Sequence, residues 1–263
     1  MSQKRNATVY TIGFTAAVCI VCSLVVSTTA VTLKPRQTRN AMLDRQKNII
    51  QVAGLIEPGV DPGREGIQRL FDQFIDPVVV ELATGTEVDI DPLMFDQAEA
   101  ARDPARSRAA PPNAAGVTRV PTHGIVYRVM KDGAVEKMIL PIEGKGLWST
   151  LYGFLALDAD ARTIRGITFY QHGETPGLGG EVDNPGWKAR WAGRQAFDEQ
   201  GEVRIEVLKK EAGPPEEDPY HVDGLSGATI TSRGVNELVR FWLGPNGFKP
   251  YIERYNASRS QAQ

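Results

Sequence analysis

The stretch from Ala7 to Leu33 constrains this chain more than any other, because its 27 residues include no charged side chain and are mostly apolar. At about 1.5 Å per residue, a helix of this length crosses a hydrocarbon core of roughly 30 Å with room for tilt. A cleaved signal peptide is the alternative, but its apolar region usually spans about 7–15 residues and ends at an A-x-A-like site, which is missing here. We therefore predict one retained transmembrane helix within an N-terminal segment of residues 1–34.

Both cysteines of the chain, Cys19 and Cys22, lie in this segment, three residues apart and so on one face of the helix. The spacing suits a metal or an attached acyl group, although small residues on a helix-packing face are the commoner reason for such a pair. Residues 35–263 contain no cysteine, which excludes disulfides and thiolate metal sites there. Redox chemistry in that part of the chain requires a cofactor.

The charges say little about partners or orientation. The 263 residues carry a formal net charge of -2 and are 41% apolar, which allows a full hydrophobic core and gives no sign of nucleic-acid binding. Basic residues flank the apolar stretch on both sides: Lys4 and Arg5 before it, and Lys34, Arg36, Arg39 and Arg45 after it. That count would place the large domain in the cytoplasm, but long domains cross membranes largely regardless of charge, so the side stays undecided.

Hydrophobic periodicity divides the remainder into a helical stalk at about residues 35–60 and a soluble domain at 61–263. Asp132-Gly133 is a hairpin signal between two strands. Residues 101–116 contain prolines and many alanines without a clear period, and are predicted to form an exposed loop. The other predicted elements are helices at 67–75, 185–193 and from about 229 onward, and strands at 78–82, 124–130, 134–140, 147–157, 164–170 and from 202 onward. Strands in runs with peripheral helices predict an α+β domain with an antiparallel sheet.

The sequence DGLSGATITSRG, residues 223–234, precedes a periodic apolar run. That run forms one buried helical face: Val235, Leu238, Val239, Trp242 and Leu243. A helix therefore begins at or near this stretch, and its first turn carries unpaired N–H groups and the positive end of the helix dipole. With Ser and Thr as caps and Gly for close backbone approach, the stretch predicts either a phosphate site or no more than a well-capped helix start.

A second conspicuous stretch, HGETPGLGG at residues 172–180, directly follows a predicted strand. Its glycines and proline indicate a sharp loop whose backbone can lie against a flat ligand. His172 and Glu174 allow an acid–base or metal interpretation, but the chain has no HExxH sequence and no nucleophile constellation. We predict no metal site and no catalytic residues.

These two stretches and GLWSTLYGFLAL, residues 146–157, follow a single membrane helix. Together they resemble the C-subunit family of the bacterial sodium-translocating NADH:quinone oxidoreductases, over nearly the whole chain and most specifically from Gly146 to Gly234. In that family, the pattern Asp, two residues, Ser or Thr, Gly, Ala, Thr is the site at which a flavin transferase joins FMN to the last Thr through a phosphoester. The pattern matches Asp223, Ser226, Gly227, Ala228 and Thr229. The resemblance implies that Thr229 is the attachment residue and that Ser226 and Thr231 are available to hold the phosphate.

The resemblance also implies an FMN-binding core at about residues 146–244, in which the loop ETPGLGG at 174–180 borders the isoalloxazine ring. The implied ring contacts are Glu174, Thr175, Leu178 and Gly179, with Trp148 as a wall. The protein would bind and orient the flavin, which carries the redox chemistry. NADH oxidation is expected in another subunit, because no G-x-G-x-x-G sequence opens a strand–helix unit here.

The implied role is an electron-transfer subunit of a translocase, with the other redox and membrane subunits, a flavin transferase and membrane lipid as partners. The implied location is the bacterial inner membrane, crossed once, with the flavin domain in the periplasm. Two alternatives stay open. One is the G subunit of a ferredoxin-linked Rnf complex, which has the same domain type. The other is a membrane-anchored binding module without redox chemistry, in which SGAT is only a helix cap.

Overall fold

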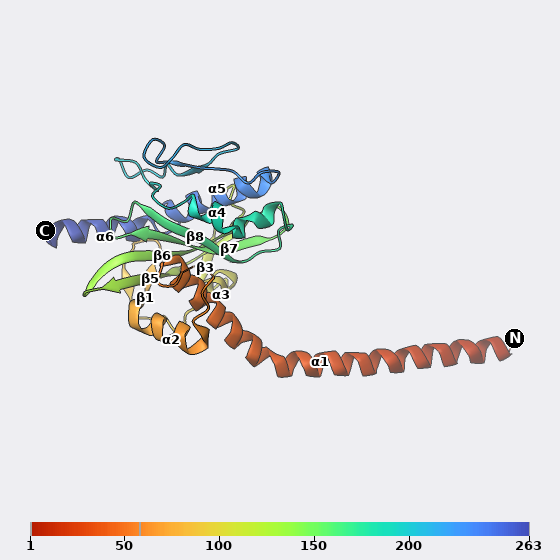
Figure 1. Cartoon of the computed structure of the whole chain (residues 1–263). Helices are drawn as coiled ribbons and strands as arrows, with labels where there is room; N and C mark the ends of the chain where they lie inside the picture. The colour runs from red at the N-terminus through yellow and green to blue at the C-terminus, as the bar shows by residue number, and fades with distance from the viewer. Residues whose placement is uncertain (1, 58, 263) are drawn as a thin grey trace. The chain divides into compact units, whose positions relative to one another are not determined.

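The computed structural model describes residues 2–57 and 59–262. By their internal contacts the described residues divide into two compact units, one up to Asp44 and one from Arg45 onward. Helix α1, Ser2–Val52, supplies all of the first unit and the beginning of the second (Figure 1).

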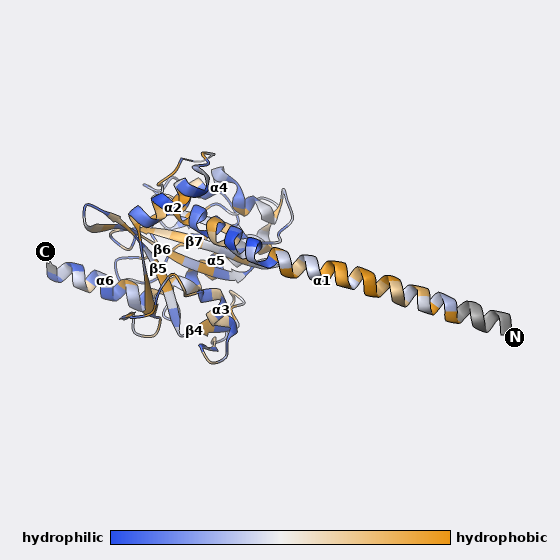
Figure 2. Ribbon diagram, turned by 90° about the horizontal axis from the view of Figure 1, so that it is seen from below, coloured by the Kyte–Doolittle hydropathy of each residue, from blue (hydrophilic) through white to orange (hydrophobic). Residues whose placement is uncertain are grey.

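The first unit is a long helix with exposed apolar side chains. Among the described residues, α1 is the one helix that is long and apolar enough to cross a membrane, and Figure 2 shows hydrophobic residues along this part of it. Cys19 and Cys22 are free and exposed. The predicted helix at 7–33 is thus part of a longer one, which contains Pro35 and runs into the region predicted as a separate stalk.

The second unit is built on a six-stranded sheet in the described chain, with strand order β2-β1-β5-β6-β7-β8. All of its neighbouring strands pair antiparallel. The strands are β1 (Ile75–Glu81), β2 (Glu87–Val88), β5 (His123–Lys131), β6 (Ala134–Lys145), β7 (Thr150–Asp158) and β8 (Ile164–Gln171). The predicted α+β domain with an antiparallel sheet is confirmed.

The hairpin between β5 and β6 follows from its two turn residues. Asp132 and Gly133 have φ angles of 52° and 80°, and positive φ at both central positions is what a two-residue type I′ turn requires. Asp tolerates this region better than most residues, and Gly adopts it without steric cost. The local sequence therefore sets the pairing next to the turn, where Lys131 lies opposite Ala134, and an irregularity between Val129 and Met130 shifts the register further along the strands.

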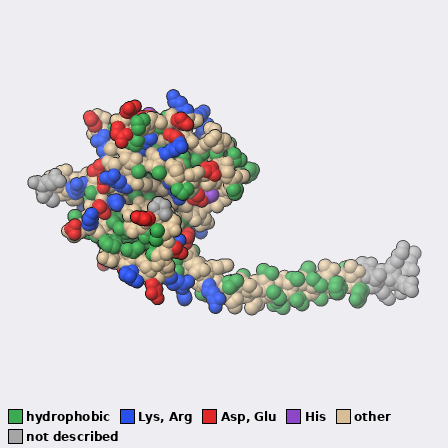
Figure 3. All heavy atoms as spheres, in the orientation of Figure 1, with side chains coloured by type: hydrophobic (Ala, Val, Ile, Leu, Met, Phe, Trp, Pro, Cys, Tyr) green, Lys and Arg blue, Asp and Glu red, His purple; other side chains and the backbone are tan. Residues whose placement is uncertain are grey.

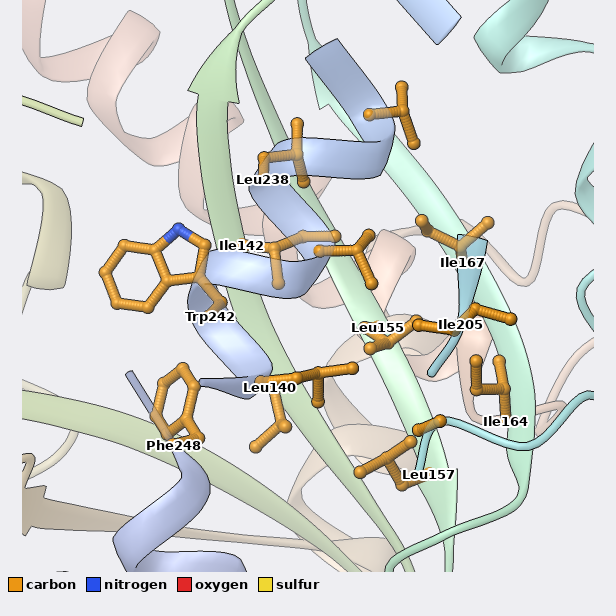
Figure 4. Packing of buried hydrophobic residues seen from close by; sticks show 14 of the residues in the cluster. Leu140, Ile142, Leu155, Leu157, Ile164, Ile167, Ile205, Leu238, Trp242 and Phe248 are labelled. Carbon is orange, nitrogen blue, oxygen red and sulfur yellow. The ribbon is translucent and has the colours of Figure 1, made fainter. Parts of the chain in front are cut away.

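One face of the sheet packs against helix α5, Thr229–Leu243 (Figure 4). Leu238 and Trp242 of α5 are fully buried in one cluster with Leu140 and Ile142 of β6. The helix approaches β6 closely, since a Cβ built on Gly144 would lie 2.4 Å from the Cβ of Leu238. The indole N–H of Trp242 also donates to the backbone oxygen of Glu143 at 2.7 Å. These contacts fix the second half of α5 beside the end of β6.

The opposite face packs against the last turns of α1 and against helix α2, Gly63–Phe74. Ile50 and Phe71 are buried there with Ile139 and Phe154 of the sheet. Neighbouring residues of β6 thus enter different clusters, as the alternation of side chains along a strand requires. Burial on both faces explains why these strands read as nearly continuous apolar runs.

Several small elements differ from the sequence predictions. Residues 101–116 are not one loop: helix α3 (Gln97–Arg102) is capped by Asp96, and β3 (Ser107–Ala109) pairs with β4 (Arg119–Pro121). The strand predicted from 202 shortens to β9 (Glu206–Val207), because its parallel partner β10 (His221–Val222) has only two residues, and on its other edge the N–H of Val207 bonds to the Asn236 side chain. The final helix is followed by a second, α6 (Lys249–Ala262), after a break at residues 244–248 that contains two glycines and Pro245.

Candidate functional site

Helix α5 begins without a side-chain cap. Its N-cap residue is Ala228, and no side chain of the described residues caps the first turn. Gly227 precedes it at a φ of 71°, in the left-handed region that suits glycine. The expectation that Ser or Thr caps this helix is therefore wrong. The first-turn N–H groups and the positive end of the dipole remain available to an anion.

The hydroxyl groups of DGLSGATITS divide into two kinds. The Ser232 hydroxyl is buried and accepts from the N–H of Leu225 at 2.8 Å. Thr231 is 1% exposed, and its hydroxyl donates to Glu174 Oε2 at 2.6 Å. Ser226 and Thr229 are exposed. Thr229 is thus the exposed hydroxyl at the first position of α5.

The Glu174 carboxylate joins three segments of the chain. It is buried, and besides Thr231 it accepts from the backbone N–H groups of the turn before β7: Leu147 at 3.2 Å, Trp148 at 2.9 Å and Ser149 at 3.3 Å. Burial by itself raises the pKa of this carboxyl, but the hydrogen bond from Thr231 and those from the backbone hold the pKa below its usual value. Glu174 therefore stays ionised and ties its own loop and the 146–149 turn to α5.

Gly179 leaves room for this junction. A Cβ at that position would lie 2.5 Å from Thr231 Oγ1 and 2.6 Å from Glu174 Oε2. The resemblance implied that Gly179 contacts the bound ring. In the structure the protein's own buried groups already require glycine there.

Exposed apolar side chains surround the junction. They are Leu147, Trp148, Leu178 and Ile230, with exposed fractions of 42%, 70%, 46% and 57%. A Cβ at Gly227 would lie 3.2 Å from the side chain of Leu178, which places this leucine beside the residues that lead into α5. Figure 3 shows hydrophobic side chains gathered at the right of the folded domain, over the start of α5 and the loop after β8. Large apolar groups held in the open beside a hydroxyl suit a flat apolar ligand.

The first residue of the pattern, Asp223, faces the protein. It is 8% exposed, pairs with Arg190, and accepts from the N–H of Ala212 at 2.9 Å. Its backbone oxygen accepts from the indole of Trp187 at 2.8 Å. Asp223 therefore anchors the approach to α5 onto helix α4, Pro185–Ala189.

A cavity of about 450 Å³ lies at the start of α5 and includes Thr229 in its lining. Its wall also includes β9 and the residues after it, among them Lys209 and Lys210, and Arg233 of α5. The volume falls in the range of small-molecule sites.

The loop histidine has partners within the protein. The Nδ1 atom of His172 accepts from the N–H of Glu174 at 3.2 Å, and Nε2 lies 2.7 Å from Asp183 Oδ2. Because Nδ1 accepts, the neutral ring carries its proton on Nε2 and donates it to Asp183. His172 thus shapes the loop that carries Glu174.

Comparison with known proteins agrees with this geometry. Residues 146–244 match the FMN-binding domain family. The chain is 48% identical over 253 residues to the C subunit of the Na(+)-translocating NADH-quinone reductase of Pseudomonas aeruginosa, and the match covers 95% of this chain and 96% of that protein. The chain belongs to this C-subunit family. A second C subunit, from Vibrio vulnificus, is 44% identical, and the match covers 93% of this chain and 94% of that one.

A solved C subunit has the same fold. The crystal structure of Shewanella oneidensis NqrC matches with a TM-score of 0.73 and 34% identity, over 81% of this chain and 96% of that one. C-subunit relatives that align over almost the full length favour the sodium-translocating family over the Rnf alternative. The cofactor of the C-subunit domain is FMN. The residues at the start of α5 fit its phosphate, and the exposed apolar side chains fit its ring.

Sequence reasoning missed some residues of this site. Ile230 carried a signal, because it lies about 140° around the helix from the buried face at Val235, at 100° per residue. An apolar residue off the buried face at a helix start therefore indicates a candidate contact with a ligand. Leu147 and Arg190 carried no such signal, since their roles depend on Glu174 and Asp223, which are far away in the sequence.

Proposed function

We propose that this chain is an electron-transfer subunit of a Na(+)-translocating NADH-quinone reductase and carries FMN joined to Thr229 through a phosphoester. The observation that carries the proposal is the position of Thr229, an exposed hydroxyl at the first residue of a helix whose N-cap is an alanine. A phosphoester needs a reachable hydroxyl, and an uncapped helix start stabilises the phosphate charge. The bound flavin supplies the redox chemistry, and the protein holds and orients it.

The residues before Thr229 give access to it. Ser226 and Gly227 are exposed, so a flavin transferase can approach the Thr229 hydroxyl from this side. Ala228 brings no side-chain oxygen that would occupy the first-turn N–H groups. The Thr231 hydroxyl does not hold the phosphate itself, because it donates to the Glu174 carboxylate. Its contribution to the phosphate site is to tie the start of α5 to the loop that carries Glu174.

The exposed apolar groups are the proposed ring contacts. Trp148 and Leu178 supply aromatic and aliphatic surface, and Thr175 is exposed in the same loop. Glu174 and Gly179 position the ring contacts. The Glu174 carboxylate accepts from the turn that carries Trp148, and Gly179 packs against the Glu174 side chain. The ring then lies at the protein surface, where a redox partner can reach it.

The proposal assigns the remaining steps to other subunits. NADH is oxidised elsewhere in the complex, and this chain relays electrons between other redox subunits. The apolar part of α1 anchors the chain in the inner membrane through lipid contacts, with the flavin domain in the periplasm. The family relationship supports this arrangement, and the length and composition of α1 support the anchor.

Mass spectrometry of the denatured chain tests the attachment. The full chain is co-expressed with a flavin transferase, purified in detergent, denatured and washed. Cleavage after Lys210 and Arg233 yields a peptide of residues 211–233 that holds both exposed hydroxyls of the pattern. We expect a mass increase of one FMN less one water, assigned to Thr229 by fragmentation. Flavin that washes away completely under denaturation would reject the covalent link.

A further inference from the structure

The cavity beside Thr229 has a cationic wall that no partner neutralises. Lys209, Lys210 and Arg233 line it and are exposed, and in the described chain none of their side chains forms an ion pair or a hydrogen bond with another residue. Many other cations of this domain are paired. Arg128 bonds to Asp76 and Glu87, and Lys249 bonds to Glu202. Cations left without an anion around one cavity are available to a charged ligand.

The acidic residues of the same cavity do not cancel this charge. Glu206 and Glu237 also line it, so these two and the three cations leave one net positive charge. Glu237 is already engaged, because its carboxylate accepts from the Asn236 side chain at 3.1 Å. The uncapped start of α5 adds the positive end of the helix dipole at Thr229. The local field therefore favours an anion next to the Thr229 hydroxyl.

We propose that this cavity is a phosphate-binding site, in which Lys209, Lys210 and Arg233 hold the phosphate group of the flavin attached at Thr229. The proposal rests on the proposed function and adds the residues that receive the charge. Attachment of FMN to a hydroxyl leaves a phosphodiester with one negative charge, which matches the net charge of the lining. Charge-assisted hydrogen bonds from guanidinium and ammonium groups to phosphate oxygens are stronger than neutral ones. The cations thus fix the phosphate end of the flavin, while the apolar side chains near Trp148 receive the ring.

A pair of ligands that differ only in the phosphate tests this site. Thr229→Val is made in the full chain, so that neither ligand can become linked, and free FMN and riboflavin are titrated by flavin fluorescence at low salt. We expect FMN to bind at least about tenfold more tightly than riboflavin. The ratio should fall toward one when Lys209, Lys210 and Arg233 are all changed to Ala, with riboflavin affinity unchanged. It should also fall with added salt, because exposed charges are screened.

A matched control removes the same number of charges elsewhere. Arg64, Arg69 and Arg254 are exposed and lie outside the cavity lining, so their triple Ala variant should keep the FMN preference. Equal affinities for FMN and riboflavin in Thr229→Val, or a preference that survives loss of the cavity cations, would overturn the site.

Flavin mobility gives a second reading that does not depend on free-ligand affinity. With Thr229 intact and flavin linked, the fluorescence anisotropy of the flavin should decay faster in the cavity variant than in the control variant. Equal decay in the two would also overturn the site. Failure of the proposed function has a different result, because a wild-type chain without linked flavin would be recognised by its unmodified mass.

Discussion

Replacing Glu174 by Gln should weaken the junction on which the flavin site is built. The carboxylate accepts from Leu147 N–H and the Thr231 hydroxyl on Oε2, and from Trp148 and Ser149 N–H on Oε1. The amide of Gln has one oxygen, so in either orientation its NH₂ group faces two donors. Rotation of the Thr231 hydroxyl recovers one bond when the NH₂ lies on that side.

The expected cost follows from this count of bonds. Hydrogen bonds to a charged group contribute about 1.5–3 kcal/mol each, so the loss of one or two predicts a destabilisation of ~1.5–6 kcal/mol. Glu181→Gln is the control, because its carboxylate accepts a hydrogen bond from the exposed Asn184 side chain at 2.7 Å and should cost less than about 0.5 kcal/mol. Urea unfolding of the full chain in detergent, followed by near-UV circular dichroism, measures both.

The pH dependence of this difference gives a further check. Because the folded-state pKa of Glu174 lies below the ordinary value of 4.5, its ionised form stabilises the fold. That contribution is complete above the ordinary value and is lost as the pH falls through the lower folded-state pKa. The gap between wild type and Glu174→Gln should therefore shrink in acid. A cost no larger than that of Glu181→Gln, or a gap that grows in acid, would refute the reasoning.

Other substitutions test neighbouring parts of the account. Gly179→Ala should cost about 1–3 kcal/mol in urea unfolding through contact with Thr231 and Glu174, whereas Gly173→Ala, whose Cβ would lie 3.4 Å from Ser149, should be nearly neutral; equal costs would remove the close-approach argument. Arg190→Ala leaves the buried Asp223 without its cation and should reduce flavin loading several-fold by mass spectrometry, while Arg204→Ala, 3.9 Å from Asp198, should load fully; full loading in both would separate Asp223 anchoring from attachment. Burial raises the pKa of Glu143 to about 7, so the folded state holds this proton more tightly than the unfolded state and stability should fall as the pH rises from about 4.5 to about 7. Glu143→Gln should remove this fall in stability, as measured by melting temperatures at pH 5 and pH 8. If the melting temperature of the variant falls between these two pH values by as much as that of the wild type, another group causes the fall.

Local signals predicted the elements whose partners are close in the sequence. The β5–β6 hairpin followed from Asp132-Gly133, and α5 followed from the spacing of its apolar residues. The short strands β2, β3, β4 and β10 were missed because each has two or three residues, too few for a period. Such strands form only because the surrounding chain brings their backbones together.

The start of α5 shows what the sequence could not decide. Four hydroxyl residues there predicted a side-chain cap, yet Ala228 is the N-cap. Thr231 bonds instead to Glu174, which lies 57 residues earlier, and Ser232 bonds back to Leu225. The residue types alone therefore could not decide which residue is the N-cap, or that Thr231 has a long-range partner. The resemblance indicated Thr229, and the fold adds that Thr229 is the exposed hydroxyl at the helix start.

Flavin attachment in Thr229→Val, compared with Ser226→Ala, tests the central claim most directly. Both residues are exposed, and Thr229 follows the N-cap, so each change should alter stability by no more than about 0.5 kcal/mol. Each full-length variant is co-expressed with the flavin transferase, denatured, and examined by in-gel fluorescence and by the mass of the 211–233 peptide. The account predicts no linked flavin in Thr229→Val and normal labelling in Ser226→Ala. Flavin that persists in Thr229→Val and disappears in Ser226→Ala would move the attachment to Ser226 and contradict the account.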